Sequence, residues 1–204
     1  DNGRWLLAPV DGGTTSRCYR GDTLVLETTW ECDDGVVRVL DFMPPRGDAP
    51  DVVRIVEGVR GRVEMRSELV IRFDYGHVVP WMRRLDEARA AVAGPDALCF
   101  RTPARTRGED MHTVSNFAVQ EGERVPFVLT WYPSHEGSPA KVDPEVALAE
   151  TETFWREWCD ACAIDLPDHT RDVVRHSLMV LKALTYAPTG GIVAAPTTSL
   201  PEAI

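Results

Sequence analysis

The sequence predicts a mainly β protein, an antiparallel β-sandwich followed by a short helical part. Residues 1–133 contain a succession of segments in which apolar and polar side chains alternate, and this alternation is the pattern of half-buried strands. Short polar turns separate these segments, and many strands with short connections are typical of stacked antiparallel sheets. After Pro133 the apolar residues change to the three- and four-residue spacing of amphipathic helices.

The strands are predicted from this alternation and from the turns between them. Residues 24–32 alternate well, and Asp33-Asp34-Gly35 then predicts a tight turn into a partner strand over residues 36–43. Pro44-Pro45 ends that strand. The longest alternation covers residues 63–75, where apolar side chains face one way and charged side chains the other. Further strands are expected at residues 78–84, 97–102, 114–120 and 126–132.

Two helices are predicted in the remaining part of the chain. After a linker over residues 134–142, Asp143-Pro144-Glu145 combines an N-cap acceptor, a proline at the first helical position and an acidic first turn. This first helix is expected to run to about Ala161. The second is expected to begin at Asp168 or Thr170 and to continue to Tyr186, before Pro188. Its apolar spacing predicts one buried face, formed by Val173, Val174, Ser177, Leu178, Leu181 and Leu184.

Composition excludes several classes of function. The net charge of −10 argues against a nucleic-acid partner, and no apolar run approaches the roughly 20 residues of a membrane span. The arginines, among them Arg83 and Arg84, are spread along the chain and predict a solvated sheet face. Five cysteines with scattered spacing predict buried free thiols and a cytoplasmic protein rather than a disulfide framework.

The sequence predicts no metal site, no cofactor and no catalytic group within these residues. Cys159-Asp-Ala-Cys162 is an isolated pair without two further zinc ligands, and it lies near a helix C-terminus, where the dipole disfavours a thiolate. His169 and His176 are about 10 Å apart along a helix, too far to share a metal. Glu27 and Glu31 share a strand face, but that face is the polar, solvated one.

The last two dozen residues carry a family resemblance. A helix runs to Pro188, Gly190-Gly191 interrupts the chain, a short apolar run follows, and Pro196-Thr-Thr-Ser-Leu-Pro-Glu202 forms a loop. This order resembles the first helix and first active-site-facing loop of the catalytic barrel in glycoside hydrolase family 15, the family of glucoamylases and bacterial trehalase-like enzymes. The resemblance is most specific over residues 177–202, with residues 177–189 as the first helix. It also covers the linker at residues 154–158 and, more weakly, the sandwich strands at residues 52–61, 72–76 and 80–81.

This resemblance implies a β supersandwich over residues 1–133, a linker with a helix over residues 134–167, and the start of an (α/α)6 catalytic domain over residues 168–204. We therefore expect the sequence to be an excerpt of a six-hairpin glycosidase that hydrolyses α-glucosidic bonds in an α-glucan, an oligosaccharide or trehalose with inversion. The catalytic carboxylates would lie further along the parent enzyme, and the excerpt alone would be inactive. The resemblance places substrate contacts at Thr197, Thr198, Ser199, Pro201 and Glu202.

Two alternatives remain open at this point. A carbohydrate-binding β-sandwich without catalysis would need a row of exposed aromatic side chains, and Trp30, Trp81, Trp131 and Tyr132 are the candidates. A relative of a sugar phosphorylase could share the same order of supersandwich and barrel. The expected partner is an α-glucoside or oligosaccharide substrate of the parent enzyme, with no nucleic acid and no membrane, and a homo-oligomer remains open.

Overall fold

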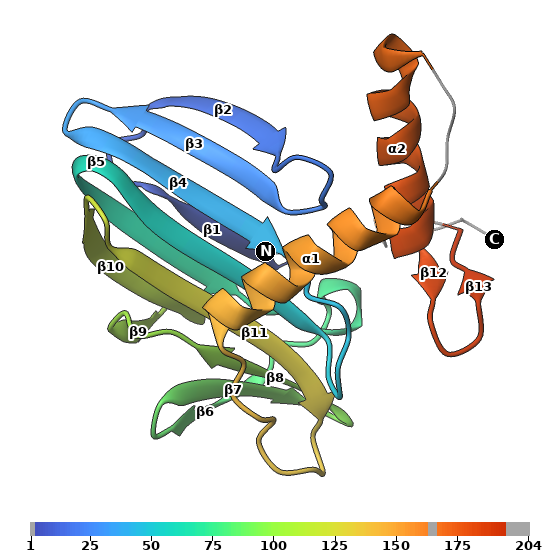
Figure 1. Ribbon diagram of the computed structural model, residues 1–204. Coiled ribbons are helices and arrows are strands. Elements are labelled where there is room, and N and C mark those ends of the chain that lie inside the picture. Colours follow the sequence, from blue (N-terminus) through green and yellow to red (C-terminus); the bar gives the residue numbers. More distant parts are fainter. Residues whose placement is uncertain (1–2, 163–166, 195–204) are drawn as a thin grey trace.

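The computed structural model describes residues 3–162 and 167–194. Two antiparallel sheets pack face to face, one helix crosses the outer face of the larger sheet, and a second helix stands beyond its end (Figure 1). The mainly β fold with a short helical part that the sequence predicts is therefore confirmed. Neither of the described helices is long and apolar enough to cross a membrane.

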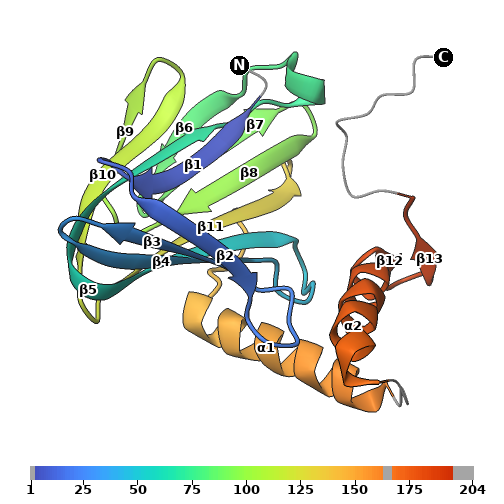
Figure 2. The same ribbon diagram turned by 90° about the horizontal axis from the view of Figure 1, so that it is seen from above.

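Each sheet is built from strands that are distant in sequence. The larger sheet has the order β2-β3-β4-β5-β11-β8-β7-β6, and the smaller sheet joins β1, β10 and β9 to the second part of β5. Seen from above, the two layers enclose a common interior (Figure 2). The strands are β1 (Arg4–Pro9), β2 (Thr14–Tyr19), β3 (Leu26–Cys32), β4 (Gly35–Phe42), β5 (Asp51–Val70), β6 (Trp81–Leu85), β7 (Ala88–Ala93), β8 (Asp96–Arg101), β9 (Thr106–Glu109), β10 (His112–Gln120) and β11 (Arg124–Pro133).

The 20-residue strand β5 joins the two sheets. Its first part, from Asp51 to Glu57, pairs with β11, and its second part, from Arg62 to Leu69, pairs with β10. Glycine is required where the strand passes between the layers. A Cβ atom at Gly58 would lie 1.9 Å from the carbonyl oxygen of Gln120, and one at Gly61 (φ +68°) would lie 2.2 Å from that of Asp34. A larger residue at either position would clash with the neighbouring backbone.

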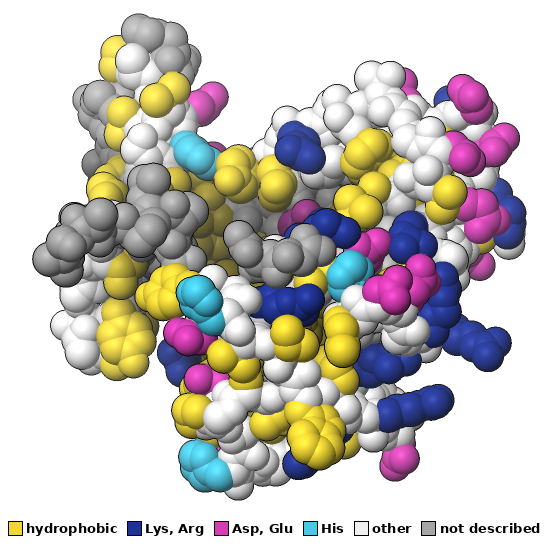
Figure 3. Space-filling view, turned by 180° about the vertical axis from the view of Figure 1, so that it is seen from behind, with side chains coloured by type: hydrophobic (Ala, Val, Ile, Leu, Met, Phe, Trp, Pro, Cys, Tyr) yellow, Lys and Arg dark blue, Asp and Glu magenta, His cyan; other side chains and the backbone are white. Residues whose placement is uncertain are grey.

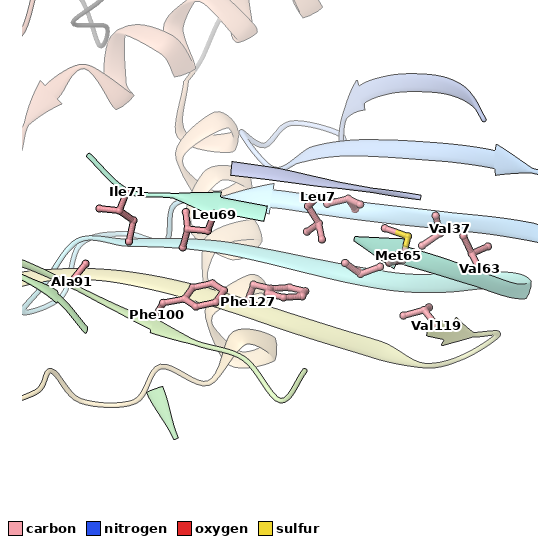
Figure 4. Packing of buried hydrophobic residues seen from close by; sticks show 12 residues of the cluster. Leu7, Val37, Val63, Met65, Leu69, Ile71, Ala91, Phe100, Val119 and Phe127 are labelled. Atoms are coloured by element: carbon pink, nitrogen blue, oxygen red, sulfur yellow. The ribbon is translucent and has the colours of Figure 1, made fainter. Parts of the chain in front are cut away.

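The main core fills the space between the sheets. Phe127 lies at its centre, with Phe117 at 5.4 Å and Phe100 at 6.2 Å between ring centroids. Figure 4 shows Phe100 and Phe127 among the aliphatic side chains of both layers. The fully or nearly buried members are Leu7, Val37, Val39, Val56, Val63, Met65, Leu69, Ile71, Ala91, Phe100, Val119 and Phe127.

Helix α1 (Pro144–Ala161) begins at the N-cap that the sequence predicts. The carboxylate of Asp143 accepts hydrogen bonds from the backbone N–H groups of Glu145 and Val146. These bonds satisfy two of the amide groups that a helix start leaves without partners. The helix packs Ala147 and Leu148 on a second apolar cluster over the outer face of the larger sheet, which is formed by Val25, Leu40, Phe42, Val53, Ile55 and Val128.

Helix α2 (Asp168–Ala183) rests on α1 through a small contact. Met179 packs against Trp155 and Cys159 of α1, and Arg175 pairs with Asp22 at 2.8 Å. A short hairpin of β12 (Thr185–Tyr186) and β13 (Gly191–Ile192) follows the helix. The predicted buried face of this helix was wrong in part, because Val173 is 69% and Leu181 is 50% exposed. Ser177 is exposed as well, and Met179, which the pattern did not single out, is the buried residue among the side chains of this helix that the structure describes.

Several strand predictions were also wrong in detail. The predicted strand over residues 63–75 ends at Val70, and the 3-10 turn η1 (Asp74–Gly76) follows it. Residues 52–61 and 63–70, predicted as separate segments, form the single strand β5. The strands β1, β2, β7 and β9 were not predicted. All six residues of β2 are exposed, so that strand carries no apolar alternation that a sequence pattern could detect.

Candidate functional site

The five predicted substrate contacts lie outside the described residues: Thr197, Thr198, Ser199, Pro201 and Glu202. The structure describes the chain that leads toward them as far as residue 194. The backbone N–H of Val193 donates to the carbonyl oxygen of Leu184 at 2.9 Å, so the start of this segment is tied to the C-terminal end of α2. The prediction for these five residues is untested.

The aromatic side chains do not form a row on the surface. Trp30 is half-buried against the main core, and Tyr132 is buried beside Ala97 and Cys99. Trp131 is half-buried, and its indole N–H donates to Asp96 at 2.9 Å. Trp81, by contrast, is 76% exposed. One exposed aromatic of the four candidates does not make the platform that a carbohydrate-binding sandwich requires.

A broad cleft of about 1120 Å³ lies at one edge of the sandwich. It lies where the chain crosses from β8 in the larger sheet to β9 in the smaller sheet. The β6–β7 hairpin forms one wall, β10 and β11 contribute Asn116, Pro126 and Val128, and Lys141 and Pro144 close the side next to α1. Lys and Arg side chains gather on the side of the molecule where β9 and β10 lie (Figure 3).

Two arginines of the cleft are held in place by backbone oxygens. Arg89 donates from Nε to the hydroxyl of Thr106 at 2.7 Å and from Nη2 to the carbonyl of Thr106 at 2.8 Å. Burial, and secondarily the neighbouring charge of Arg84, lowers the pKa of Arg89. Arg101 donates from Nη2 to the carbonyl of Pro139 at 2.7 Å, while its Nη1 is buried without a hydrogen-bond partner. Both guanidinium groups are thus fixed, and Arg101 retains an unused donor.

The acidic groups of the cleft lie at its rim. Asp86 and Glu87 are exposed in the β6–β7 turn, and Glu87 pairs with Lys141, which lowers the pKa of the Glu87 carboxyl. Arg107 pairs with Glu109 at 3.0 Å. No ion pair is recorded for Arg84 or Arg105 in the described part of the chain, so these two exposed cations are not compensated by a carboxylate.

The cleft does not contain the acid and base that glycoside hydrolysis needs. An inverting enzyme uses one carboxyl group with a raised pKa opposite a second, ionised one. Glu87 has a lowered pKa, the opposite of a general acid. Burial raises the pKa of Asp51, but this carboxyl accepts a hydrogen bond from Thr130 at 2.5 Å and does not line the cleft. The two carboxyls that line the cleft among the described residues, Asp86 and Glu87, both lie at its exposed rim.

The other carboxylates that stand out have ion-pair roles. Glu27, predicted to be solvated, is instead largely covered, with its side chain 17% exposed and paired to Arg38 at 3.0 Å. Its neighbour Glu31 is exposed, as predicted. Glu68 lies between Arg4 and Arg66, and its hydrogen bonds to these two guanidinium groups hold the pKa of the carboxyl below its usual range.

The cysteines and histidines form no metal site among the described residues. All five thiols are free, as the scattered spacing predicts. Burial raises the pKa of Cys159, so this member of the Cys159–Cys162 pair is a packed thiol rather than a reactive thiolate. Cys18 is exposed, which corrects the prediction that the cysteines are buried.

Similarity to known proteins covers almost the whole chain. This chain is 31% identical to a trehalase of Mycolicibacterium smegmatis over 92% of the chain's length. It is 30% identical to a trehalase of Mycobacterium tuberculosis over 98% of the chain's length. A trehalase of Thermoplasma acidophilum is 27% identical over 83% of the chain. The matches cover 32%, 33% and 29% of these relatives. The chain is thus a relative of trehalases, and it spans about a third of their length.

Family models and solved structures give weaker similarity than these relatives. No protein-family model matches the chain. A solved structure described as a kojibiose phosphorylase from the human microbiome is similar over 87% of this chain and 27% of its own, with 8% identity and a TM-score of 0.43.

Arginines of the cleft are the residues that sequence reasoning missed. Arg84, Arg89, Arg101, Arg105 and Arg107 lie within 24 residues of each other, but basic residues of this region were interpreted as a solvated sheet face. The density of arginine between residues 84 and 107 was the available signal. This density does not by itself predict a cleft. The chain must cross from β8 to β9 to bring Arg84 and Arg89 to the same cleft as Arg101, Arg105 and Arg107.

Proposed function

We propose that this chain is the non-catalytic N-terminal part of a glycoside hydrolase family 15-like enzyme that hydrolyses α-glucosidic bonds with inversion, with trehalose as the first substrate to test. In this proposal, residues 1–133 are the β-sandwich, residues 134–167 the linker, and residues 168–204 the start of the (α/α)6 catalytic domain. The observation that carries it is the identity of about 30% to trehalases over nearly the whole chain.

Two features of the structure support a bracing role for this part. The described cleft offers no carboxyl pair of the required kind, which fits a position of the catalytic groups elsewhere in the enzyme. Apolar side chains also remain exposed on α2 and after it, at Val173, Val180, Leu181, Ile192 and Val193. Further helices of a barrel would cover them and so attach the catalytic domain to the sandwich through α1.

The activity is tested with the enzyme that contains this chain and α,α-trehalose. Attack of water with inversion releases one β-glucose from the attacked ring, while the leaving glucose keeps its α configuration. Proton NMR during early turnover should therefore detect equal amounts of the two anomers. Two α-glucose molecules would contradict inversion, and a requirement for phosphate with glucose 1-phosphate as product would make the enzyme a phosphorylase.

The division of labour has its own test. Residues 1–204 alone should release no glucose from trehalose or maltose, and turnover by this chain would overturn the non-catalytic proposal. In the enzyme that contains it, Thr198→Ala together with Ser199→Ala should raise the Michaelis constant, because hydroxyls that contact substrate would be lost. Ser16→Ala, on the exposed strand β2, is the matched control. Unchanged kinetics in the double variant would remove these hydroxyls from the site.

A carbohydrate-binding module is less well supported than the enzyme part. Such a module would need a row of exposed aromatic side chains, whereas Trp30, Trp131 and Tyr132 are half-buried or buried.

A further inference from the structure

Two turns contain all the non-glycine residues with a positive φ in the described part of the chain. Asp74 (φ +48°) and Tyr75 (φ +52°) lie in η1, and Asp110 (φ +47°) and Met111 (φ +63°) lie between β9 and β10. This backbone conformation is unfavourable for large side chains, whereas glycine adopts it readily. Tyr75 and Met111 are nevertheless 77% and 74% exposed, so packing within this chain does not offset the strain. Strained residues of this kind cluster where proteins bind or act.

Backbone hydrogen bonds hold both turns in a fixed shape. Phe73 and Val78 exchange two of them across η1, at 2.9 and 3.0 Å. Glu109 and His112 pair across the other turn, which leaves a two-residue hairpin loop whose second position favours glycine rather than Met111. A side chain presented by a rigid turn loses little conformational entropy when a partner covers it.

The two turns border an exposed apolar surface. Val79 and Met82, which follow η1, line one shallow hollow together with Met111, and the hollow is floored by the buried side chains of Leu69 and Ile71. Contiguous exposed apolar surface is typical of a contact with another protein body. We call this the η1 surface, and its exposed members are Tyr75, Val78, Val79, Met82 and Met111.

The η1 surface lies at the end of the sandwich that faces the helical part. In both ribbon views the turn after β5 is on the same side of the sandwich as α2 and the β12–β13 hairpin (Figures 1 and 2). The matches to the two trehalases above 29% identity cover 32% and 33% of those relatives. Most of each relative therefore lies outside the matched part and includes material that could cover this surface.

We propose that the η1 surface is a docking site for the catalytic domain, separate from the attachment through α2. This inference rests on the proposed function, which makes α2 the start of that domain and so places the domain on the side where α2 and η1 both lie. The domain would present apolar side chains to Tyr75 and Met111, with basic groups at the rim opposite Asp74 and Asp110. The small contact at Met179 alone leaves a hinge, and a second contact at η1 would fix the orientation of the domain on the sandwich.

Met111 itself reports whether the surface is covered. Residues 1–204 and the enzyme that contains them are treated with dilute hydrogen peroxide, and mass spectrometry follows sulfoxide formation at Met111 and at Met43, which is 60% exposed outside the surface. Met111 should react at least about fivefold more slowly in the enzyme, because oxidation requires access to the sulfur, and Met43 should react equally in both proteins. Equal rates for Met111 in the two proteins, or equal protection of Met43, would overturn the proposal.

A pair of double variants tests whether the contact stabilises the enzyme. The test variant is Val79→Ser with Met111→Gln. The control is Val10→Ser with Met43→Gln, the same replacements at side chains that are 56% and 60% exposed outside the surface.

In residues 1–204 neither double variant should change thermal unfolding appreciably, because the replaced side chains are exposed there. In the enzyme, at the same scan rate, the test variant should lower the unfolding midpoint by at least about 2 °C, and the control should not. An enzyme in which the test variant melts like the wild type or like the control would contradict the proposal.

Other occupants of the surface give different results. Protection of Met111 in residues 1–204 that grows with protein concentration would mean that a second copy covers it, and protection by added trehalose would mean that sugar binds there. Either result would overturn docking of the catalytic domain. None of these measurements requires turnover, so an enzyme that covers Met111 but does not cleave trehalose would contradict the proposed function and leave this inference intact.

Discussion

The sandwich and the helical part of this chain differ in how much of their apolar surface the chain itself covers. In the sandwich, two sheets enclose a continuous core in which Phe127 and Met65 are fully buried. Helix α2 has one buried apolar residue, Met179, and leaves Val173 and Leu181 exposed. The sandwich therefore has the interior of an independent folding unit, whereas α2 depends on a small contact with α1 and on the pair between Arg175 and Asp22 at the edge of the sandwich. The two regions should respond to mutation in different ways.

The largest effect is expected from the centre of the sandwich. Phe127→Ala removes a fully buried ring that contacts Phe100 and Phe117, and it should lower the free energy of unfolding by about 3–5 kcal/mol because it leaves a cavity. Urea denaturation followed by circular dichroism measures this loss. Trp81→Ala, at a ring that is 76% exposed, is the control and should change stability by less than about 0.5 kcal/mol. Equal losses would mean that the core is not where the structure places it.

A smaller and more local effect is expected at the contact between the helices. Met179→Ala should weaken the packing of α2 on Trp155 and Cys159 by about 2 kcal/mol, at the low end for a buried methionine. Since the sandwich does not rely on α2, hydrogen exchange should accelerate in residues 170–183 while β5 and β11 keep their protection. Val173→Ala, at an exposed position of the same helix, should leave both regions unchanged. Loss of protection in β5 would contradict the independence of the sandwich.

Helix α1 belongs to both regions, because it packs on the sheet at its start and carries α2 near its end. Asp143→Ala removes the carboxylate that caps the N–H groups of Glu145 and Val146, and should cost about 1 kcal/mol. Thermal unfolding of the variant measures the cost, and Asp143→Asn, which retains a side-chain acceptor, should recover most of it. A similar loss in both variants would show that charge, not the hydrogen bonds, sets the effect.

The sandwich was predictable because burial on one face imposes alternation on the sequence. Residues 26–32 and 35–42, with the Asp33–Gly35 turn, could be placed to within about two residues. The strands β2 and β9 could not, because their residues are mostly exposed and only pairing with neighbours orders them. The passage of β5 between the sheets depends on close backbone approach at Gly58, which sequence spacing does not reveal.

Local chemistry was predictable where it depends on neighbours in sequence, as with the Asp143 cap and the inert Cys159. The cleft was not, because it depends on where β8 and β9 lie in space. Arg89 and Thr106 are 17 residues apart and on different sheets, and the sequence offered no reason to join them. The apolar spacing of α2 correctly indicated a helix, but periodicity alone does not specify which residue meets α1.

The smallest expected effect concerns the pH dependence of the sandwich edge at Asp51. Burial raises the pKa of this carboxyl in the folded state despite its hydrogen bond from Thr130. A group with a raised folded pKa favours folding in its protonated form, so its contribution is fully present below the unfolded pKa of about 4 and is lost as pH rises through the folded value.

Asp51→Asn keeps an acceptor for Thr130 and removes the charge. The variant should therefore be slightly more stable than the wild type at pH 7, and this difference should shrink as the pH falls to about 3. Urea unfolding at a series of pH values measures the difference, with Asp48→Asn, in an exposed loop, as control. A variant less stable than the wild type at pH 7 would contradict this expectation. The hydrogen bond from Thr130 and the charge of Arg101 would then stabilise the ionised carboxylate by more than its burial destabilises it.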